Sequence, residues 1–227
     1  MRCALAQRSA YDPLHRGGDA LATYTSASGD TTILVADASA KGRIGETHAD
    51  ALRSGFLASA PLGATPRDIL RQLNRTFFGV TCEDTEITFA SAFIARVTHG
   101  RSITYACAGH DSALLFRGRD HEHLSPTGPI LGIRPEVTYE ERTLRLNRND
   151  VVVVPTDGVT ESCNAFAHAR QFGTTGIARA MRDADLRDGC SVAEHILRAC
   201  DAFCSKRYRD DASIAILGND VAGTRAL

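Results

Sequence analysis

Segments with strand character and segments with helical periodicity come in blocks along this sequence, and this order most constrains its fold. Strands are predicted at residues 2–10, 20–27, 31–36, 87–97, 102–107, 113–116, 137–146, 151–154 and 212–217, and helices at 44–56, 65–77, 176–182 and 192–206, with a shorter helix after Asp157. Runs of strands followed by pairs of helices are typical of layered α+β structures, whereas a parallel βαβ sheet requires strict alternation. The sequence therefore predicts an α+β fold.

The helix predictions rest on apolar spacing and on a start signal. Apolar residues from Ile44 to Phe56 recur at i, i+4, i+7 and i+8, which gives a helix one packed face. Thr65-Pro66 followed by Asp68 is a helix-start pattern. The last long helix is predicted to bury one face formed by Val192, Ile196, Cys200 and Phe203.

Size and composition are those of one globular domain, predicted to span residues 1–227. The chain is 43% hydrophobic and 23% charged, which excludes a disordered or fibrous protein, and no Pro/Gly/Ser linker separates two domains. Seven cysteines at scattered spacings indicate reduced thiols in the cytoplasm rather than a disulfide framework.

Charge and hydropathy exclude several kinds of partner. With 26 basic and 27 acidic residues, the net charge of −1 gives no support to a broad nucleic-acid or membrane-surface footprint. No apolar run approaches the roughly 18 residues of a membrane span. The N-terminal residues lack the apolar core of a signal peptide. We therefore expect neither a nucleic-acid partner nor a membrane partner.

Acidic residues adjoin three apolar strands. Asp37 follows Thr31–Ala36, Asp157 follows the run that begins at Val151, and Asp210-Asp211 directly precedes the last strand. If these strands lie side by side, the carboxylates converge, and a cluster of hard oxygen ligands suits Mg²⁺ or Mn²⁺. The alternative is that Asp37 and Asp157 only cap the helices that follow them. Spacing alone leaves both interpretations open.

Several segments resemble one family in its own order. They are Arg16-Gly-Gly-Asp19, Val35-Ala-Asp37-Ala-Ser-Ala-Lys-Gly42, Tyr105-Ala-Cys-Ala-Gly-His110, Gly128-Pro-Ile-Leu-Gly-Ile133, Thr156-Asp-Gly-Val-Thr-Glu161 and Asp210-Asp-Ala-Ser213. Together they are similar to the motifs of the SpoIIE-like branch of the metal-dependent (PPM, type 2C) serine/threonine protein phosphatases. The resemblance covers nearly the whole chain, from about residue 5 to residue 217.

The resemblance implies a four-layer α-β-β-α sandwich, in which a central antiparallel β-sandwich is flanked by helix pairs, with two Mn²⁺ or Mg²⁺ ions bound at one end. It assigns Asp37 as the ligand that bridges both ions. Asp157 and Asp210 complete one ion, while Asp19 and the backbone carbonyl of Ala38 serve the other. Asp37, Asp157 and Asp210 are thus the expected catalytic residues. A water activated by two metals needs no Cys or Ser nucleophile.

By the same resemblance, the chain hydrolyses phosphoserine or phosphothreonine on a bacterial regulatory protein. The implied partner is a phosphorylated STAS-type anti-sigma-factor antagonist or a stressosome component. The alternative is a pseudophosphatase or binding module of the same fold. Only Ala40 favours it, because Ala40 replaces a glycine of the family motif and would be strained if that position needs a positive φ.

Other polar residues have two interpretations each. Arg16 and Arg43 are candidate substrate-binding residues because guanidinium groups suit phosphate. For Arg16 a solvated side chain fits equally well, and for Arg43 we favour a solvated residue in the first turn of the helix. His110 is either a substrate contact or, as we favour, structural. For His121 and His123 we predict a solvated polar loop, and for Cys200 and Cys204 burial rather than zinc binding.

Overall fold

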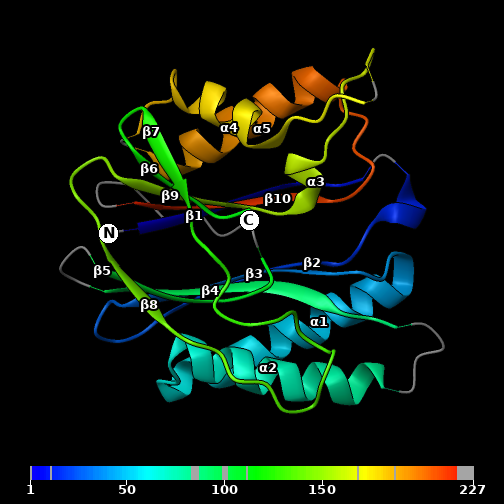
Figure 1. The fold of residues 1–227 in the computed structure, drawn as a ribbon, viewed down its shortest axis with the longest axis vertical. Coiled ribbons are helices and arrows are strands. Elements are labelled where there is room, and N and C mark those ends of the chain that lie inside the picture. Colours follow the sequence, from blue (N-terminus) through cyan, green and yellow to red (C-terminus); the bar gives the residue numbers. More distant parts are fainter. Residues whose placement is uncertain are drawn as a thin grey trace. The chain divides into compact units, whose positions relative to one another are not determined.

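The computed structural model describes residues 2–10, 12–82, 87–98, 102–110, 112–167, 169–186 and 188–218. Contacts divide the chain into two compact units. Unit 1 comprises Met1–Arg16, Ser112–Leu124 and Leu146–Leu227, and unit 2 comprises Gly17–Asp111 and Ser125–Arg145. Each unit contains one antiparallel sheet with its own helices (Figure 1).

The sheet of unit 1 has five strands in the order β1-β10-β9-β6-β7, and every neighbouring pair is antiparallel. The strands are β1 (Arg2–Arg8), β6 (Leu114–Arg117), β7 (Asp120–His123), β9 (Val151–Pro155) and β10 (Ala212–Gly218). The unit also contains the short helix η1 (Pro13–His15) and the helices α3 (Asp157–Thr160), α4 (Gly173–Met181) and α5 (Gly189–Cys204).

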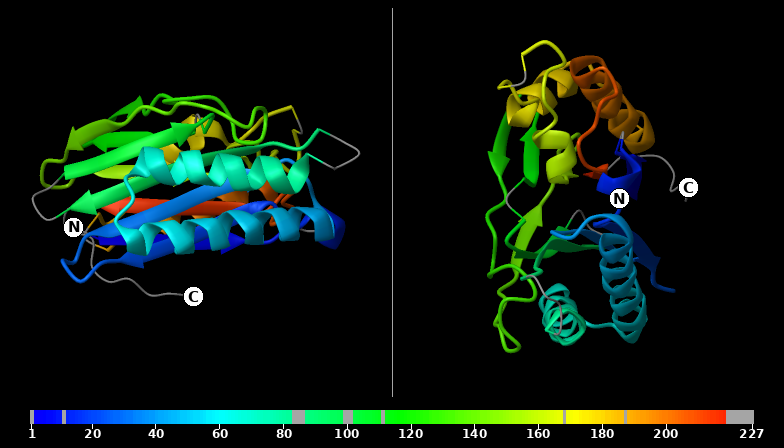
Figure 2. Two further views of the ribbon diagram at one scale, coloured as in Figure 1. Left: turned by 90° about the horizontal axis from the view of Figure 1, so that it is seen from below. Right: turned by 90° about the vertical axis from the view of Figure 1, so that its right-hand side faces the viewer.

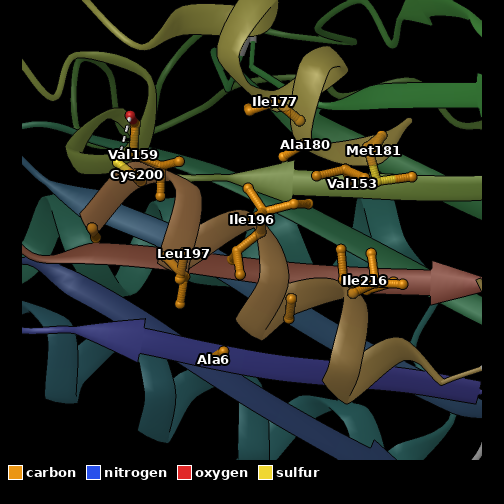
Figure 3. Close-up of a cluster of buried hydrophobic side chains, with 14 of the residues drawn as sticks. Ala6, Val153, Val159, Ile177, Ala180, Met181, Ile196, Leu197, Cys200 and Ile216 are labelled. Carbon is orange, nitrogen blue, oxygen red and sulfur yellow. Dashed lines mark hydrogen bonds between the residues drawn. The ribbon is translucent and has the colours of Figure 1, made fainter. Parts of the chain in front are cut away.

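The core of unit 1 lies between this sheet and helices α4 and α5. Ile196 and Leu197 of α5 are fully buried near β9 and β10, where Val153 and Ile216 face them (Figure 3). The predicted apolar face of α5 is confirmed, because Val192, Ile196 and Cys200 are buried and Phe203 is half-buried against Phe172.

The sheet of unit 2 has five antiparallel strands in the order β2-β3-β4-β5-β8. They are β2 (Asp19–Thr25), β3 (Thr31–Ala38), β4 (Ala90–Thr98), β5 (Ser102–Ala108) and β8 (Arg142–Arg145). The helices α1 (Gly42–Ser59) and α2 (Pro66–Thr81), joined by η2 (Ala60–Leu62), lie side by side over this sheet (Figure 2).

Local signals explain where the helices of unit 2 begin and what they bury. Helix α2 begins at Pro66, as the start pattern predicts, and the Thr65 hydroxyl at its N-cap donates to the Asp68 carboxylate at 2.9 Å. Leu52 and Phe56 of α1, with buried residues of α2, cover one face of the sheet. The α+β class is therefore confirmed, with two antiparallel sheets.

Two strand predictions were wrong. Residues Asp120–His123 form strand β7, paired with β6, instead of a loop. All four side chains are exposed, so no hydrophobic alternation marks the strand, and the turn at Gly118 (φ 65°) sets the pairing. The strand predicted at 137–146 shortens to β8, because the segment before it is irregular and only residues 142–145 pair with β5.

The seven cysteines are all within the described residues and all are free thiols. Cys200 and Cys204 are buried, as predicted. In the described part of the chain, no helix combines the length and the apolar character needed to cross a membrane.

Candidate metal centre

Two acidic side chains of unit 2 face each other across neighbouring strands. The β2–β3 register places Asp19 directly opposite Asp37. Asp19 is buried and the Asp37 side chain is 13% exposed, so both carboxylates are largely removed from water. The Lys41 ammonium lies 3.5 Å from Asp37 Oδ1. Like charges directly opposite in a sheet are destabilising on their own, and a cation between them reverses the sign of that interaction.

The two glycines before Asp19 leave space for the backbone of Ala38 and the side chain of Asp37. Gly17 and Gly18 have φ values of 85° and 122°, which L residues with a side chain rarely adopt. The Gly18 carbonyl accepts a hydrogen bond from the Ala38 N–H at 2.9 Å. A Cβ on Gly18 would lie 2.8 Å from the Ala38 carbonyl oxygen and 3.0 Å from Asp37 Oδ1. Only glycine permits this approach, which explains the Gly-Gly-Asp element.

Ala40 does not have the conformation that would strain it. Among the described residues, the non-glycine residues with positive φ are Asn149, Ser205 and Lys206. The left-handed position in this loop is instead taken by Gly42, whose φ is 63°. The Ala40 methyl group is therefore tolerated.

In unit 1, strand pairing brings Asp157 and Asp210 to one edge of the sheet. Strands β9 and β10 pair with Pro155 opposite Ile214. One step further, the Thr156 N–H donates to the Ser213 carbonyl at 2.9 Å, and the Ser213 N–H donates to the Thr156 hydroxyl at 3.0 Å. Asp157 follows this pair on one strand, and Asp210 precedes it on the other.

Gly158 allows α3 to lie directly against the segment before β10. A Cβ at Gly158 would lie 2.0 Å from the Asp211 carbonyl oxygen. Asp157 and Asp210 consequently line one cavity of about 170 Å³. The other lining residues are Gly158, Glu161, Ser162, Cys163, Gln171 and Arg209.

Backbone contacts orient the second carboxylate of this cavity. The Asp211 N–H donates to Asp210 Oδ1 at 2.8 Å. The buried Asp211 carboxylate accepts a hydrogen bond from the Ala10 N–H at 2.7 Å. Asp211 is therefore tied to Ala10, two residues beyond the end of β1, while Asp210 lines the cavity.

The helix-cap interpretation of the acidic residues is wrong. The N-cap of α1 is Lys41, and Asp37 belongs to strand β3. The N-cap of α3 is Thr156, and Asp157 is the first residue inside the helix. Neither carboxylate caps the helix that follows it, so neither position is explained by helix capping.

The candidate substrate residues occupy different surroundings. Arg16 is exposed, and its Nε donates to the Ala10 carbonyl at 3.2 Å. Arg43 is exposed in the first turn of α1. His110 is buried, and its Nδ1 lies 3.1 Å from the Ser91 hydroxyl, while its carbonyl accepts from the Cys107 thiol at 2.9 Å. These contacts favour the structural interpretation of His110.

Ser91 was missed in the sequence. It stands opposite Asp37 in the β3–β4 register and links that strand position to His110. No local pattern marks Ser91, because its relation to Asp37 exists only through sheet register.

The donors in both units are of one chemical kind. Unit 2 offers Asp19, Asp37 and the Ala38 carbonyl, and unit 1 offers Asp157 and Asp210. All are hard oxygen donors, with neither thiolate nor imidazole among them, and such donors fit Mg²⁺ or Mn²⁺ better than Zn²⁺ or Cu²⁺. The residues present therefore fit the metals that the resemblance implies.

Comparison with known proteins places the chain in a family. Residues 27–219 match the sequence profile described as Stage II sporulation protein E (SpoIIE). The chain belongs to the SpoIIE family. This confirms the resemblance seen in the motifs, and the profile match runs through segments of both units.

One curated relative of this SpoIIE-family chain is the phosphoserine phosphatase RsbU of Bacillus subtilis (strain 168). The two are 30% identical over 103 residues, which is 44% of this chain and 30% of RsbU. The match thus spans under a third of the length of that relative.

Solved structures share the fold. The SiaA-PP2C domain of Pseudomonas aeruginosa has a TM-score of 0.79 at 19% identity, with 96% of this chain and 86% of that chain covered. The PP2C phosphatase domain of SpoIIE from Bacillus subtilis has a TM-score of 0.74 at 14% identity, covering 95% of this chain and 62% of that chain. The two antiparallel sheets with their helices therefore form a PP2C-type fold.

Proposed function

We propose that this SpoIIE-family chain is a protein-serine/threonine phosphatase that uses two divalent cations, Mn²⁺ or Mg²⁺. Its proposed substrate is phosphoserine or phosphothreonine on a bacterial regulatory protein, specifically a STAS-type anti-sigma-factor antagonist or a stressosome component. The observation that carries the proposal is the placement of carboxylates where core strands end, opposite one another in unit 2 and in one cavity in unit 1. The relative named as a phosphoserine phosphatase supports it.

We further propose that both units act as one catalytic domain over residues 1–227, because the family match extends through segments of each. We also propose a cytoplasmic location, which the proposed substrate class and the seven free thiols support.

The proposed ligand assignment gives each acidic residue one task. In this proposal Asp37 would be shared by both ions, Asp157 and Asp210 would help to hold one, and Asp19 and the Ala38 carbonyl would help to hold the other. When bound, two divalent cations acidify a shared water and balance the charge of the phosphoryl oxygens during in-line displacement.

Four further residues are proposed to orient these ligands or the substrate. Gly18 leaves space beside the Ala38 carbonyl, and Lys41 lies close enough to Asp37 to balance part of its charge. Arg16, whose Nε is engaged by the Ala10 carbonyl, would present its terminal nitrogens to the phosphoryl group. Arg43 would make a second contact. No cysteine is needed as a nucleophile.

Hydrolysis of p-nitrophenyl phosphate, with and without Mn²⁺, tests the activity. We expect hydrolysis that depends on Mn²⁺ or Mg²⁺ and that EDTA abolishes. A phosphorylated STAS-type protein should then be dephosphorylated under the same metal dependence. Full activity in metal-free buffer would contradict the proposal.

The same assay separates the phosphatase from a pseudophosphatase. The pseudophosphatase alternative rested on strain at Ala40, and Ala40 is not among the described residues with positive φ. Turnover no faster than that of a metal-free control, in a protein that still binds Mn²⁺, would favour the alternative.

A further inference from the structure

The segment that joins α5 to β10 begins in a strained conformation. Ser205 and Lys206 have φ values of 53° and 60°, which non-glycine residues adopt only at a cost in energy. The segment carries Asp210, one of the two carboxylates in the cavity of unit 1. Strain of this kind persists only where surrounding contacts hold it.

A buried tyrosine holds the middle of this segment. The Tyr208 side chain is 3% exposed, and its hydroxyl donates to Asp201 Oδ1 at 2.9 Å. The same hydroxyl lies 3.4 Å from the Leu197 carbonyl. At the start of the segment, the Lys206 N–H donates to the Asp201 carbonyl at 3.0 Å. Asp201 therefore holds the segment through both its backbone and its side chain.

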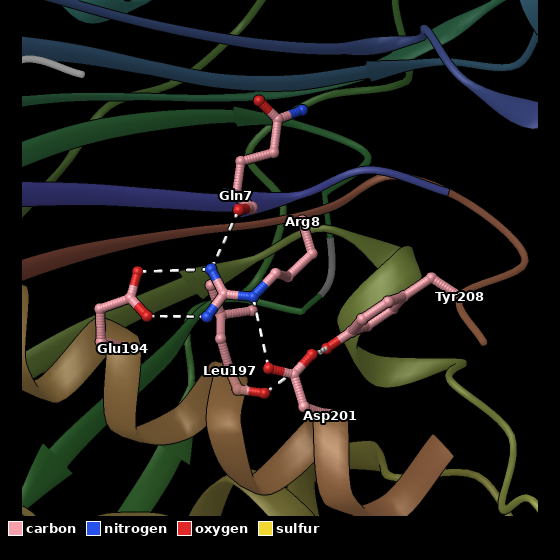
Figure 4. A network of polar contacts seen from close by, with 6 residues as sticks. All are labelled: Gln7, Arg8, Glu194, Leu197, Asp201 and Tyr208. Carbon is pink, nitrogen blue, oxygen red and sulfur yellow. Dashed lines mark hydrogen bonds and ion pairs between the residues drawn. The ribbon is translucent and has the colours of Figure 1, made fainter. Parts of the chain in front are cut away.

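Arg8 in β1 fixes the other side of the Asp201 carboxylate. Its Nε lies 3.4 Å from Asp201 Oδ2, and its two terminal nitrogens bond both oxygens of Glu194 at 3.3 and 2.7 Å (Figure 4). A bidentate pair of this kind restricts the guanidinium plane. The network thus links β1, α5 and Tyr208.

Beyond Tyr208 the chain is fixed again within three residues. Asp211 accepts from the Ala10 N–H, and its own N–H donates to Asp210 Oδ1. Asp210 therefore lies between two anchors, Tyr208 on α5 and Asp211 beside β1. The position of its carboxylate depends on both.

We propose that Tyr208 is a positioning residue for Asp210: its hydrogen bond to Asp201 holds the strained segment so that the Asp210 carboxylate faces the cavity shared with Asp157. This inference rests on the proposed function, in which Asp210 is a metal ligand. The metal affinity of the protein then depends on a hydroxyl group that touches no metal, as outer-shell partners do in other metal sites.

Calorimetric titration of metal-stripped protein of residues 1–227 with Mn²⁺ tests the inference in Tyr208→Phe. We expect the dissociation constant for Mn²⁺ to rise about 10-fold, at the lower end of the range for outer-shell partners. Asp201→Asn keeps an oxygen that accepts the tyrosine hydrogen bond, so its dissociation constant should stay closer to that of the wild type.

Glu194→Gln is the matched control, because it breaks the Arg8 ion pair in the same network without touching the segment that carries Asp210. We expect this variant to melt at a lower temperature and to bind Mn²⁺ within about 2-fold of the wild type. A purely structural role for Tyr208 predicts that both variants lower the melting temperature and neither changes the affinity for Mn²⁺, and that outcome would overturn the inference.

Ser205→Gly provides a second test, because glycine adopts the left-handed conformation at φ 53° without the cost that the tyrosine hydrogen bond offsets. Ser205→Gly alone should bind Mn²⁺ as the wild type does, and Ser205→Gly/Tyr208→Phe should lose less affinity for Mn²⁺ than Tyr208→Phe alone. The double variant also serves if Tyr208→Phe does not fold. A double variant that folds but binds Mn²⁺ at least about 10-fold more weakly than Ser205→Gly would count against a role for strain, and no loss in either tyrosine variant would overturn the inference. Wild-type protein that neither binds Mn²⁺ nor hydrolyses phosphate esters would reject the proposed function itself, and the inference with it.

Discussion

Glycines determine how closely the backbone approaches the acidic residues in both units. Gly18 lies against the Ala38 carbonyl and the Asp37 carboxylate, and Gly158 lies against the Asp211 carbonyl. At each of these positions a single methyl group would meet backbone or carboxylate oxygen. The glycines of the Gly-Gly-Asp and Thr-Asp-Gly segments are therefore required by contact, in addition to any preference for turns.

The first prediction at this scale concerns Asp157→Asn. We expect kcat to fall about 100-fold or more, because asparagine supplies no negative charge to a divalent cation. Without metal, the variant should melt at or above the temperature of the wild type, since one of two like charges in the cavity is removed. Melting curves and turnover, with and without Mn²⁺, measure both effects. Wild-type turnover in this variant would make the ligand assignment untenable.

A second prediction concerns Gly158→Ala. Its new Cβ would lie 2.0 Å from the Asp211 carbonyl oxygen, so the backbone must shift, and we expect a loss of about 1–3 kcal/mol in the free energy of unfolding. Gly79→Ala in α2 is the control, because nothing lies within 4 Å of its added Cβ. Alanine should stabilise that helix by up to about 1 kcal/mol. Urea unfolding of both variants distinguishes a steric effect from a general effect of replacing glycine.

Helix α5 packs against the core of unit 1 with one face and carries two carboxylates that bind Arg8. Its apolar face, with Ile196 and Leu197, packs into the core of unit 1. The carboxylates of Glu194 and Asp201 accept hydrogen bonds from the guanidinium group of Arg8 in β1. The Cys200 thiol also donates to the Val159 carbonyl of α3 at 3.8 Å (Figure 3). One helix thereby holds both α3, which begins with Asp157, and the segment that carries Asp210.

For α5 we predict that the stability contributed by Glu194 depends on pH. The hydrogen bond from Arg8 lowers the pKa of the Glu194 carboxyl below its usual value. A carboxyl group with a lower pKa in the folded state adds stability above its unfolded pKa, near 4.3, and this contribution is lost as the pH falls through the folded value. The melting difference between wild type and Glu194→Gln should therefore be constant from about pH 8 to pH 5 and shrink as the pH falls below about 4.3. Because the Glu194 side chain is 43% exposed, the difference should be small. A difference that persists unchanged at pH 3 would contradict this account.

At the scale of the whole molecule, each unit has its own hydrophobic core, and each contributes part of the proposed set of metal ligands. A ligand that binds only the folded chain stabilises it by mass action. Metal binding should therefore be visible in the unfolding of the entire protein as well as in turnover.

We expect Mn²⁺ at about 100 times its dissociation constant to stabilise the fold by about 2.7 kcal/mol per site. For a chain of this length, that corresponds to an increase in melting temperature of about 5–10 °C. EDTA should reverse the increase, and the combined variant Asp157→Asn/Asp210→Asn should show little of it. A melting temperature that does not respond to Mn²⁺ would contradict the proposed metal centre.

The α+β class, the apolar face of α5, the start of α2 and the acidic residues at strand ends could all be predicted from the order of residues. The apolar face of α1 was predicted only in part, because Leu52 and Phe56 are buried but Ile44 is 59% exposed. These features are local, because periodicity, helix-start patterns and strand boundaries depend on neighbouring residues. The acidic motifs were also recognisable because their residues are adjacent in the chain.

The remaining features depend on contacts between distant parts of the chain. Strand β7 has no apolar alternation, and it forms because its backbone pairs with the edge of β6. The pairing of Asp19 with Asp37, and the position of Ser91 opposite Asp37, come from sheet register. Arg8 and Tyr208 meet through Asp201 because β1 and the segment after α5 pack against the same helix. Such relations join residues distant in sequence, and no local pattern encodes them, since the free energy that fixes them comes from packing of the folded chain.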